Sequence, residues 1–228
     1  MRNRIARAAV LAAGVLALTA APAFAAGSEG GTADGAARSC GELRLSVALP
    51  VPPAGGAVHQ QVTVGADCRP VLGEAVLVPA AGGPAAKAAA GPAAATTTRQ
   101  VKSWNEMFDC CNIRMSGLYT TSSWSSDGAR VTTASTDATQ QWNREPWNAG
   151  WSLKSATKNS DCTADCAVSH TEAHAEFGYR GIFDATGAWY ANTHHTYVDL
   201  AADGTATCRF DVELRHSFIG WNWQHGCQ

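Results

Sequence analysis

Residues 169–180 read SHTEAHAEFGYR, and polar and apolar side chains alternate along this segment. Successive side chains of a β-strand point to opposite faces of the sheet, so this pattern predicts a strand that is buried on one face only. The face that we expect to meet solvent carries His170, Glu172, His174, Glu176 and Arg180. The face that we expect to be buried carries Ala173, Ala175, Phe177 and Tyr179.

Two turn signals follow this segment and separate two further strands. Asp-Ala-Thr-Gly at 184–187 predicts the first turn, and Ala-Asp-Gly at 202–204 predicts the second. Residues 189–200 and 205–218 fill the intervals, and the second of these again alternates. One of its faces carries Cys208, Phe210, Val212, Leu214 and Phe218. The three segments together predict a long antiparallel meander at the C-terminus.

The segments before this meander also favour strands. Residues 118–124 and 130–135 flank an Asp-Gly pair at 127–128, which is a hairpin signal, and residues 151–157 form another expected strand. Turn signals that recur between strands are typical of all-β folds. We therefore predict an all-β, disulfide-stapled antiparallel domain, either a sandwich or barrel-like, over residues 101–228.

The N-terminus carries the three parts of a secretory signal peptide in the usual order. Arginines precede an apolar run at 8–21, and Ala-Phe-Ala at 23–25 supplies a cleavage pattern. We predict a signal peptide over 1–25 and a disordered Gly/Ala/Ser-rich segment over 26–39. No other stretch is long and apolar enough to predict a membrane span. We therefore expect a secreted, extracellular protein, and its excess of arginine over lysine indicates a bacterial source.

Residues 40–78 predict a small β module, which a linker over 79–100 joins to the main domain. The module contains Cys40 and Cys68, which we expect to form its one disulfide. A module of about 40 residues with one disulfide is marginal for independent folding, so it either leans on the main domain or is a pro-region. The linker consists mainly of Ala, Gly, Pro and Thr, and it has no large apolar side chain to build a core.

The cysteines predict a disulfide framework, because their even number lies in a chain expected to reach an oxidising compartment. Cys227 stands one residue from the C-terminus, so we expect its bridge to hold the tail. Cys110 and Cys111 point opposite ways in extended backbone, which predicts two different partners. A zinc site at Cys162 and Cys166 is the alternative. The predicted disulfide cysteines are Cys40, Cys68, Cys110, Cys111, Cys162, Cys166, Cys208 and Cys227.

The polar face of the 169–180 strand suggests a metal site. Imidazole nitrogens and carboxylate oxygens both bind zinc, and a histidine of the next strand would add a ligand. The expected ligands are His170, Glu172, His174 and His195. The same row would serve acid–base hydrolysis if a nearby arginine held an anion. The simpler alternative is a solvated sheet face with ordinary cross-strand ion pairs.

Tryptophans suggest a second kind of site. They lie beside Asn, Gln and Arg in segments that we expect to be loops or strand ends, and an exposed indole next to amides suits a sugar ring. The predicted binding residues are Trp142, Trp147, Trp151, Trp221 and Trp223. The alternative is that these rings form the core, since few Leu and Ile are left to build one.

Charge and motifs narrow the functional class. Lys+Arg 17 against Asp+Glu 19 gives a formal net charge of -2, which argues against a nucleic-acid-binding protein. The chain also lacks the G-x-S-x-G, H-E-x-x-H and P-loop motifs. We therefore predict a non-enzymatic extracellular binding module for a glycan, the cell wall or a protein partner. The alternatives are a secreted metal-binding protein or acid–base hydrolase, with zinc as the cofactor, and a secreted inhibitor or toxin-like effector.

Overall fold

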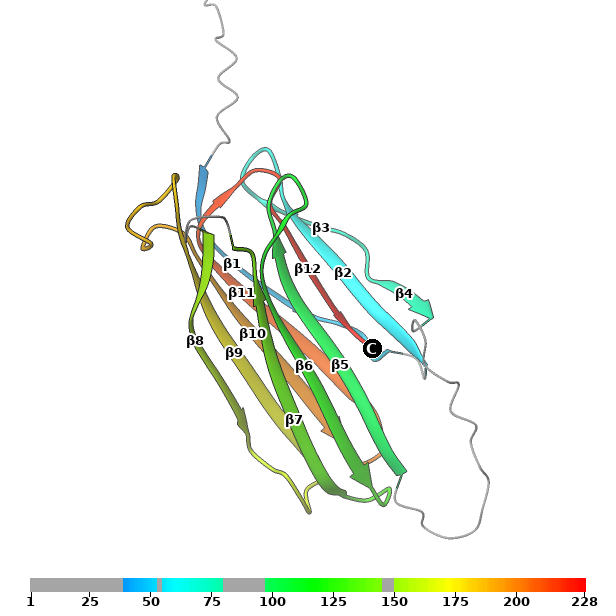
Figure 1. The fold of residues 1–228 in the computed structure, drawn as a ribbon. Helices are drawn as coiled ribbons and strands as arrows, with labels where there is room; N and C mark the ends of the chain where they lie inside the picture. Colours follow the sequence, from blue (N-terminus) through cyan, green and yellow to red (C-terminus); the bar gives the residue numbers. More distant parts are fainter. Residues whose placement is uncertain (1–38, 53–54, 80–96, 145–149) are drawn as a thin grey trace, which may run out of the picture. The chain divides into compact units, whose positions relative to one another are not determined.

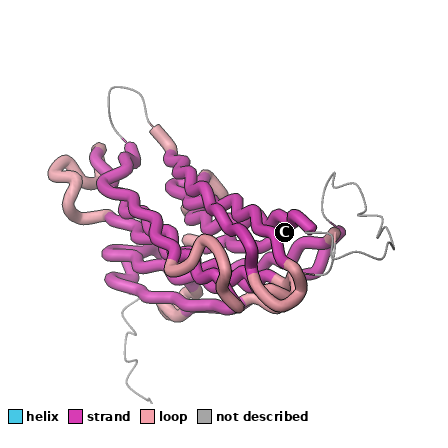
Figure 2. The backbone as a smooth tube through the Cα atoms, turned by 90° about the horizontal axis from the view of Figure 1, so that it is seen from below, coloured by secondary structure: helices cyan, strands magenta, loops and turns pink. Residues whose placement is uncertain are grey.

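The computed structural model describes residues 39–52, 55–79, 97–144 and 150–228, and these contain strands and no helix (Figures 1 and 2). The first six strands are β1 (Ser39–Ala48), β2 (Gly56–Val64), β3 (Pro70–Leu72), β4 (Val76–Pro79), β5 (Thr97–Phe108) and β6 (Arg114–Ser126). The last six are β7 (Val131–Trp142), β8 (Gly150–Ser160), β9 (Val168–Arg180), β10 (Ala191–Ala201), β11 (Ala206–Phe218) and β12 (Asn222–Cys227).

Several predictions from the sequence lie outside the described residues. These are the signal peptide, nearly all of the segment expected to be disordered, most of the linker, and Trp147. The two ends of the predicted linker do fall within strands, because Pro79 ends β4 and residues 97–100 begin β5. Within the described part of the chain, no helix is long and apolar enough to cross a bilayer.

The strands form two antiparallel sheets that pack as a sandwich, which confirms the predicted fold class. Sheet A has the order β1-β11-β10-β9-β8, and sheet B has the order β3-β2-β12-β5-β6-β7, with β4 also pairing with β2. Contacts of β10 with β5 and β6, and of β9 with β7, join the two sheets. The predicted meander is β9-β10-β11, the centre of sheet A.

Burial along the meander follows the alternation of the sequence. Ala173, Ala175 and Phe177 of β9 are fully buried, whereas His170 and Glu172 on the other face are exposed. On β11, the alternating apolar side chains likewise enter the core. A shift of one residue in strand pairing would turn every apolar side chain outward, so burial fixes the register that we observe.

The segment 40–78 contributes strands to both sheets of the sandwich, as expected for a module that leans on the main domain. β1 pairs with β11 of sheet A, and β2 pairs with β12 of sheet B, so the segment adds a strand to each sheet. The described strands all belong to one compact unit. The physical reason is that a few short strands cannot bury an apolar face by themselves, so they pack against the strands of the main domain.

Three disulfides hold the sandwich together. Cys40–Cys68 is the predicted bridge of the N-terminal segment. Cys208–Cys227 joins β11 of sheet A to β12 of sheet B, which confirms that the C-terminal tail is bridged.

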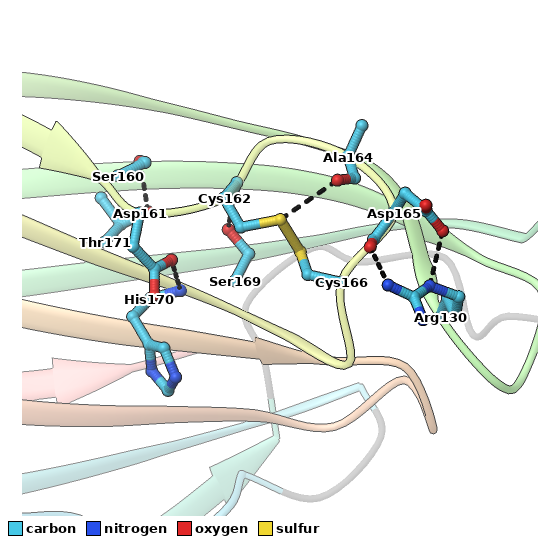
Figure 3. Close-up of a disulfide and its surroundings, with 10 residues drawn as sticks. All are labelled: Arg130, Ser160, Asp161, Cys162, Ala164, Asp165, Cys166, Ser169, His170 and Thr171. Carbon is cyan, nitrogen blue, oxygen red and sulfur yellow. Dashed lines mark hydrogen bonds and ion pairs between the residues drawn. A yellow bond between two sulfur atoms is a disulfide. The ribbon is translucent and has the colours of Figure 1, made fainter.

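The third bridge, Cys162–Cys166, closes the connection between β8 and β9, so these two sulfurs are not free to bind zinc (Figure 3). Cys110 and Cys111 are both exposed and unbridged, so the prediction of eight disulfide cysteines is wrong for these two. The remaining cysteines are all taken by the three bridges, which leaves these adjacent residues with no other cysteine to pair with.

The strand connections gather at two ends of the sandwich, and they differ in character (Figure 1). We call one the polar end; its turns are 127–130, 161–167 and 202–205. We call the other the apolar end; it contains the turn 109–113 and the loop 181–190. Exposed large hydrophobic side chains occur at the apolar end, on the edge strands of sheet B and at Val51 in the β1–β2 connection, and none lies in the three polar turns.

Candidate functional site

The predicted metal ligands lie on the outer face of sheet A, but they do not converge. His195 lies opposite His174 across the β10–β9 pair, with ring centroids 4.7 Å apart, and its Nδ1 is 3.2 Å from Glu172 Oε1. His170 instead pairs with Asp199, with 2.7 Å from Nδ1 to Oδ1. Among the described residues, no three His, Cys, Asp or Glu side chains are arranged to hold a metal ion.

The spacing of a strand explains this outcome. Residues that share a face repeat about every 7 Å, so His170 and His174 start about 13 Å apart along β9. One ion cannot bridge that separation with zinc–nitrogen distances of about 2 Å. The predicted four-residue site is therefore not formed.

The electrostatics of this face are those of separate pairs. The hydrogen bond with the Asp199 carboxylate raises the pKa of His170. Burial, and then the neighbouring His195, lower the pKa of His174. Arg209 of β11 donates to Asp211 on its own strand and lies 3.6 Å over the ring of Tyr197. This arrangement matches the alternative of cross-strand pairs on a solvated face.

Most of the tryptophans predicted to bind a ligand belong to the core. Trp151 and Trp221 are buried and Trp223 is 0 % exposed, so the predicted exposed aromatic surface is wrong for these three residues. Trp142 is partly buried and packs against Phe177. The physical reason is the scarcity of large aliphatic residues, which leaves indole rings to fill the space between the sheets.

A buried polar chain connects the two sheets next to Trp223. Ser116 of β6 lies 2.9 Å from His194 Nε2, and His194 Nδ1 lies 2.8 Å from Asn105 Oδ1 on β5. The indole nitrogen of Trp223 donates to the same Asn105 oxygen at 2.7 Å. Ser, His and Asn in this order resemble a nucleophilic triad in geometry. All three residues are 0 % exposed, so no substrate reaches them. These hydrogen bonds instead fix how the two sheets pack.

The loop 181–190 carries exposed apolar side chains that the sequence analysis missed. Ile182 is 88 % exposed, Phe183 73 % and Trp189 53 %. Isolated exposed hydrophobic residues are common on protein surfaces, but three in one loop with an indole and a phenyl ring are typical of a contact surface. We call these three residues the apolar platform.

Asp184 organises this loop from inside. Its Oδ1 accepts hydrogen bonds from the Thr186 amide and hydroxyl and from the Gly187 amide, and its Oδ2 accepts from the amides of Trp189 and Tyr190. The distances run from 2.6 to 3.3 Å. These bonds, the Thr186 hydroxyl first, lower the pKa of Asp184 to about 2. The carboxylate is therefore charged at neutral pH, and it holds the loop in one shape.

Side chains of the neighbouring strands support the loop from sheet A. The Trp189 ring stacks on His216 of β11, with centroids 4.0 Å apart and planes 8° from parallel. Arg215 donates to the carbonyl oxygen of Ala188 at 2.7 Å, and Arg180 donates to that of Ala185 at 3.2 Å. The two guanidinium groups thus bond the backbone of loop 181–190 at two points.

A signal for this loop was present in the sequence. Residues 184–187 predicted a turn, and the preceding Gly-Ile-Phe at 181–183 placed two large apolar residues directly before it. Turns are usually rich in polar residues, so Ile and Phe beside a turn signal indicate a surface with a use beyond chain reversal.

Comparison of the chain with protein-family models, with curated proteins and with solved structures gave no match.

Proposed function

We propose that this protein is a secreted, non-enzymatic binding module that recognises a protein partner through the apolar platform of loop 181–190. The observation that supports this proposal most directly is the exposure of Ile182, Phe183 and Trp189 on a loop that Asp184 holds in place. The predicted signal peptide and the three disulfides support export to an oxidising compartment.

The composition of the platform favours a protein partner. Tryptophan and arginine are among the residues that contribute most to protein–protein binding, and here Arg180 and Arg215 bond the backbone of the loop that carries Trp189. A glycan site needs several free hydrogen-bonding side chains for the sugar hydroxyls. The Asp184 carboxylate already bonds within the loop, and Ile182 and Phe183 have no polar side-chain atoms.

The rigidity of the loop supports the same conclusion. A loop that is already ordered loses little conformational entropy when it binds, so more of the contact energy appears as affinity. β-Sandwiches commonly carry recognition residues in the loops at one end, where variation does not disturb the strands. The apolar end fits this scheme.

Site-specific photo-crosslinking tests the proposal. A photoreactive amino acid replaces Phe183 in one preparation and Leu77 of β4, which is 59 % exposed, in a control preparation. Each is mixed with culture fluid and washed cells of the producing organism. We expect a discrete protein adduct from position 183 and none from position 77. Excess unlabelled wild-type protein should compete this adduct away, and the Trp189→Ala variant should not.

Three results would contradict the proposal. One is an equal set of adducts from positions 183 and 77, and another is equal competition by wild type and by Trp189→Ala. The third is retention on cells after protease treatment has removed surface proteins, which would assign a glycan or lipid ligand.

A further inference from the structure

Cys110 and Cys111 form a pair of thiols apart from the three structural bridges. Both are exposed, and their Sγ atoms lie 3.8 Å apart in the turn between β5 and β6. The other six cysteines are all bridged to one another. The chain therefore has one place where two thiols meet at the surface.

Several hydrogen bonds shape the turn that carries the pair. Asp109 Oδ1 accepts hydrogen bonds from the amides of Cys111 and Ile113, each at 2.8 Å. The Asp109 amide donates to the Ile113 carbonyl oxygen at 3.0 Å, and Asn112 adopts a left-handed φ of 60°. Asn222 of β12 also donates to the Asp109 carbonyl oxygen, at 3.4 Å. The turn itself thus brings the two thiols together.

We propose that Cys110 and Cys111 are a reversible thiol–disulfide exchange site whose reactant is an external disulfide. One cysteine attacks the external S–S bond as its thiolate, one reactant sulfur leaves as a thiolate, and a mixed disulfide forms. The second cysteine then attacks the mixed disulfide, releases the second reactant sulfur and closes the Cys110–Cys111 bond. Two electrons pass to the reactant, and the two protons lost by the cysteines end on its two thiols.

Adjacency makes the closed form easy to reopen. The Cα atoms of neighbouring residues are about 3.8 Å apart, whereas disulfides usually join Cα atoms at least 4.4 Å apart. The three structural bridges of this protein have Cα–Cα distances of 5.2, 6.5 and 6.2 Å. A bond between adjacent cysteines is therefore strained, and strained, exposed disulfides are the easily reduced ones.

The surroundings of Cys111 bear on the order of the two attacks. The hydrogen bond with Cys110 and the charge of Asp109 raise the pKa of the Cys111 thiol. The thiolate is the attacking species, so Cys111 suits the second, intramolecular attack better than the first. The exposure of both thiols sets the pair apart from the Cys208–Cys227 bridge, whose two cysteines are buried between the sheets.

Graded reduction followed by alkylation tests the proposal. The purified protein is treated first with oxidised glutathione and then with increasing dithiothreitol, blocked with iodoacetamide and mapped by mass spectrometry. We expect an internal Cys110–Cys111 disulfide after oxidation. It should open at a dithiothreitol concentration about tenfold or more below that needed for the other three bridges.

Single variants test the order of steps. Cys111→Ser and Cys110→Ser each remove one thiol, so the remaining thiol should hold one glutathione as a stable mixed disulfide. The wild-type protein should release the glutathione as its Cys110–Cys111 disulfide forms. Leu77→Ser serves as the matched control, because it introduces the same side chain at an exposed position on β4 and should leave this chemistry unaltered.

Three outcomes would overturn the inference. One is that both cysteines stay open to alkylation after oxidised glutathione. Another is that the pair bridges two chains instead of closing on itself. The third is that the closed pair resists dithiothreitol as strongly as Cys40–Cys68 does. None of these results depends on whether the platform binds a protein.

Discussion

Asp203 and Asp184 organise chain reversals at opposite ends of the sandwich, and the surfaces that they support differ. Asp203 accepts hydrogen bonds from the Thr205 amide and hydroxyl, at 2.8 and 2.7 Å, and closes a short polar turn between β10 and β11. Asp184 accepts five hydrogen bonds and holds a longer loop between β9 and β10, from which Ile182 and Phe183 project. An aspartate that accepts hydrogen bonds therefore closes a short polar turn at one end of the sandwich and shapes a loop with exposed apolar side chains at the other.

Several charged and polar groups at the polar end bond one another. Around the Cys162–Cys166 bridge, Arg130 pairs with Asp165, and the His170 amide donates to Asp161 at 2.8 Å (Figure 3). The apolar end leaves large hydrophobic side chains in solvent. Exposing them costs free energy, and burial against a partner would recover about 25 cal/mol per Å² of apolar area. Under the proposed function, the polar end stabilises the sandwich and the apolar end binds the partner.

The first prediction, with the largest expected effect, is a loss of folding stability at low pH. It tests whether the two ends of the sandwich unfold together with one core. Burial lowers the pKa of His194 and of His225 to about 3, against about 6.5 for an unfolded histidine. Between these pH values the unfolded chain binds the protons and the folded protein does not, so stability falls as pH decreases below about 6.5. Each histidine should cost about 2 kcal/mol between pH 6.5 and pH 5.

Urea unfolding at pH 7, 6 and 5, followed by hydrogen exchange, measures this loss. We expect amides of β6 and β10 near both ends to lose protection together. The His225→Gln variant keeps one of the two buried histidines, so it should lose roughly half as much unfolding free energy between pH 7 and pH 5. A protein equally stable at pH 7 and pH 5, or one whose ends open at different pH values, would refute the shared core.

The second prediction concerns the apolar platform. Trp189→Ala removes the indole that stacks on His216, and we expect the affinity for the crosslinked partner to fall about 30-fold or more. The melting temperature should change little, since Trp189 is 53 % exposed. Leu77→Ala on β4 is the control and should leave the affinity within about twofold. Equal losses in both variants would remove the functional distinction between loop 181–190 and the rest of the surface.

The third prediction concerns the disulfide at the polar end, whose removal should lower stability without changing partner binding. Replacing Cys162 and Cys166 together with serine opens a short loop, so the cost in stability should be about 2 kcal/mol. The bridge lies far along the sheets from the platform, so partner affinity should stay the same (Figure 1). Chemical denaturation and partner binding measure the two quantities separately. A loss of binding in this variant would show that the ends are coupled.

The smallest effect compares the two aspartates directly. Asp184→Ala should loosen loop 181–190 and weaken partner binding about tenfold, because the platform would pay ordering entropy when it binds. Asp203→Ala should loosen only its own turn and leave binding unaltered. Hydrogen exchange of the two segments and an affinity measurement together decide this. Binding that survives Asp184→Ala would mean that preorganisation of the loop has no role.

Much of the fold follows from local patterns. The alternation in β9 and β11 predicted the strands and the buried faces, and the turn signals predicted the meander, because side-chain direction in a strand depends only on sequence position. The pairing of Cys40 with Cys68 followed from their isolation in one segment. The place of β1 beside β11 did not follow, because these strands are far apart in sequence and their pairing depends on the edges left by other strands.

The candidate sites were harder to predict for the same reason. His170 and His174 share a face, but strand spacing keeps them about 13 Å apart, and their neighbours Asp199 and His195 come from β10. The sequence around Trp223 does not show whether its indole is buried in the core or exposed to bind a ligand. The packing of the two sheets buries it. The loop 181–190 had a visible signal in its Ile-Phe pair, but its support by Arg215 and His216 comes from another strand.

By itself, the sequence determined that the chain forms antiparallel strands with one buried face, because alternation and turn chemistry act between near neighbours. Only the tertiary structure decided which side chains meet. The packing of the two sheets buried Trp223, the pairing of β9 with β10 placed His170 beside Asp199, and the position of β11 placed His216 against Trp189. These outcomes depend on contacts between residues distant in sequence, which the order of residues along one strand does not specify.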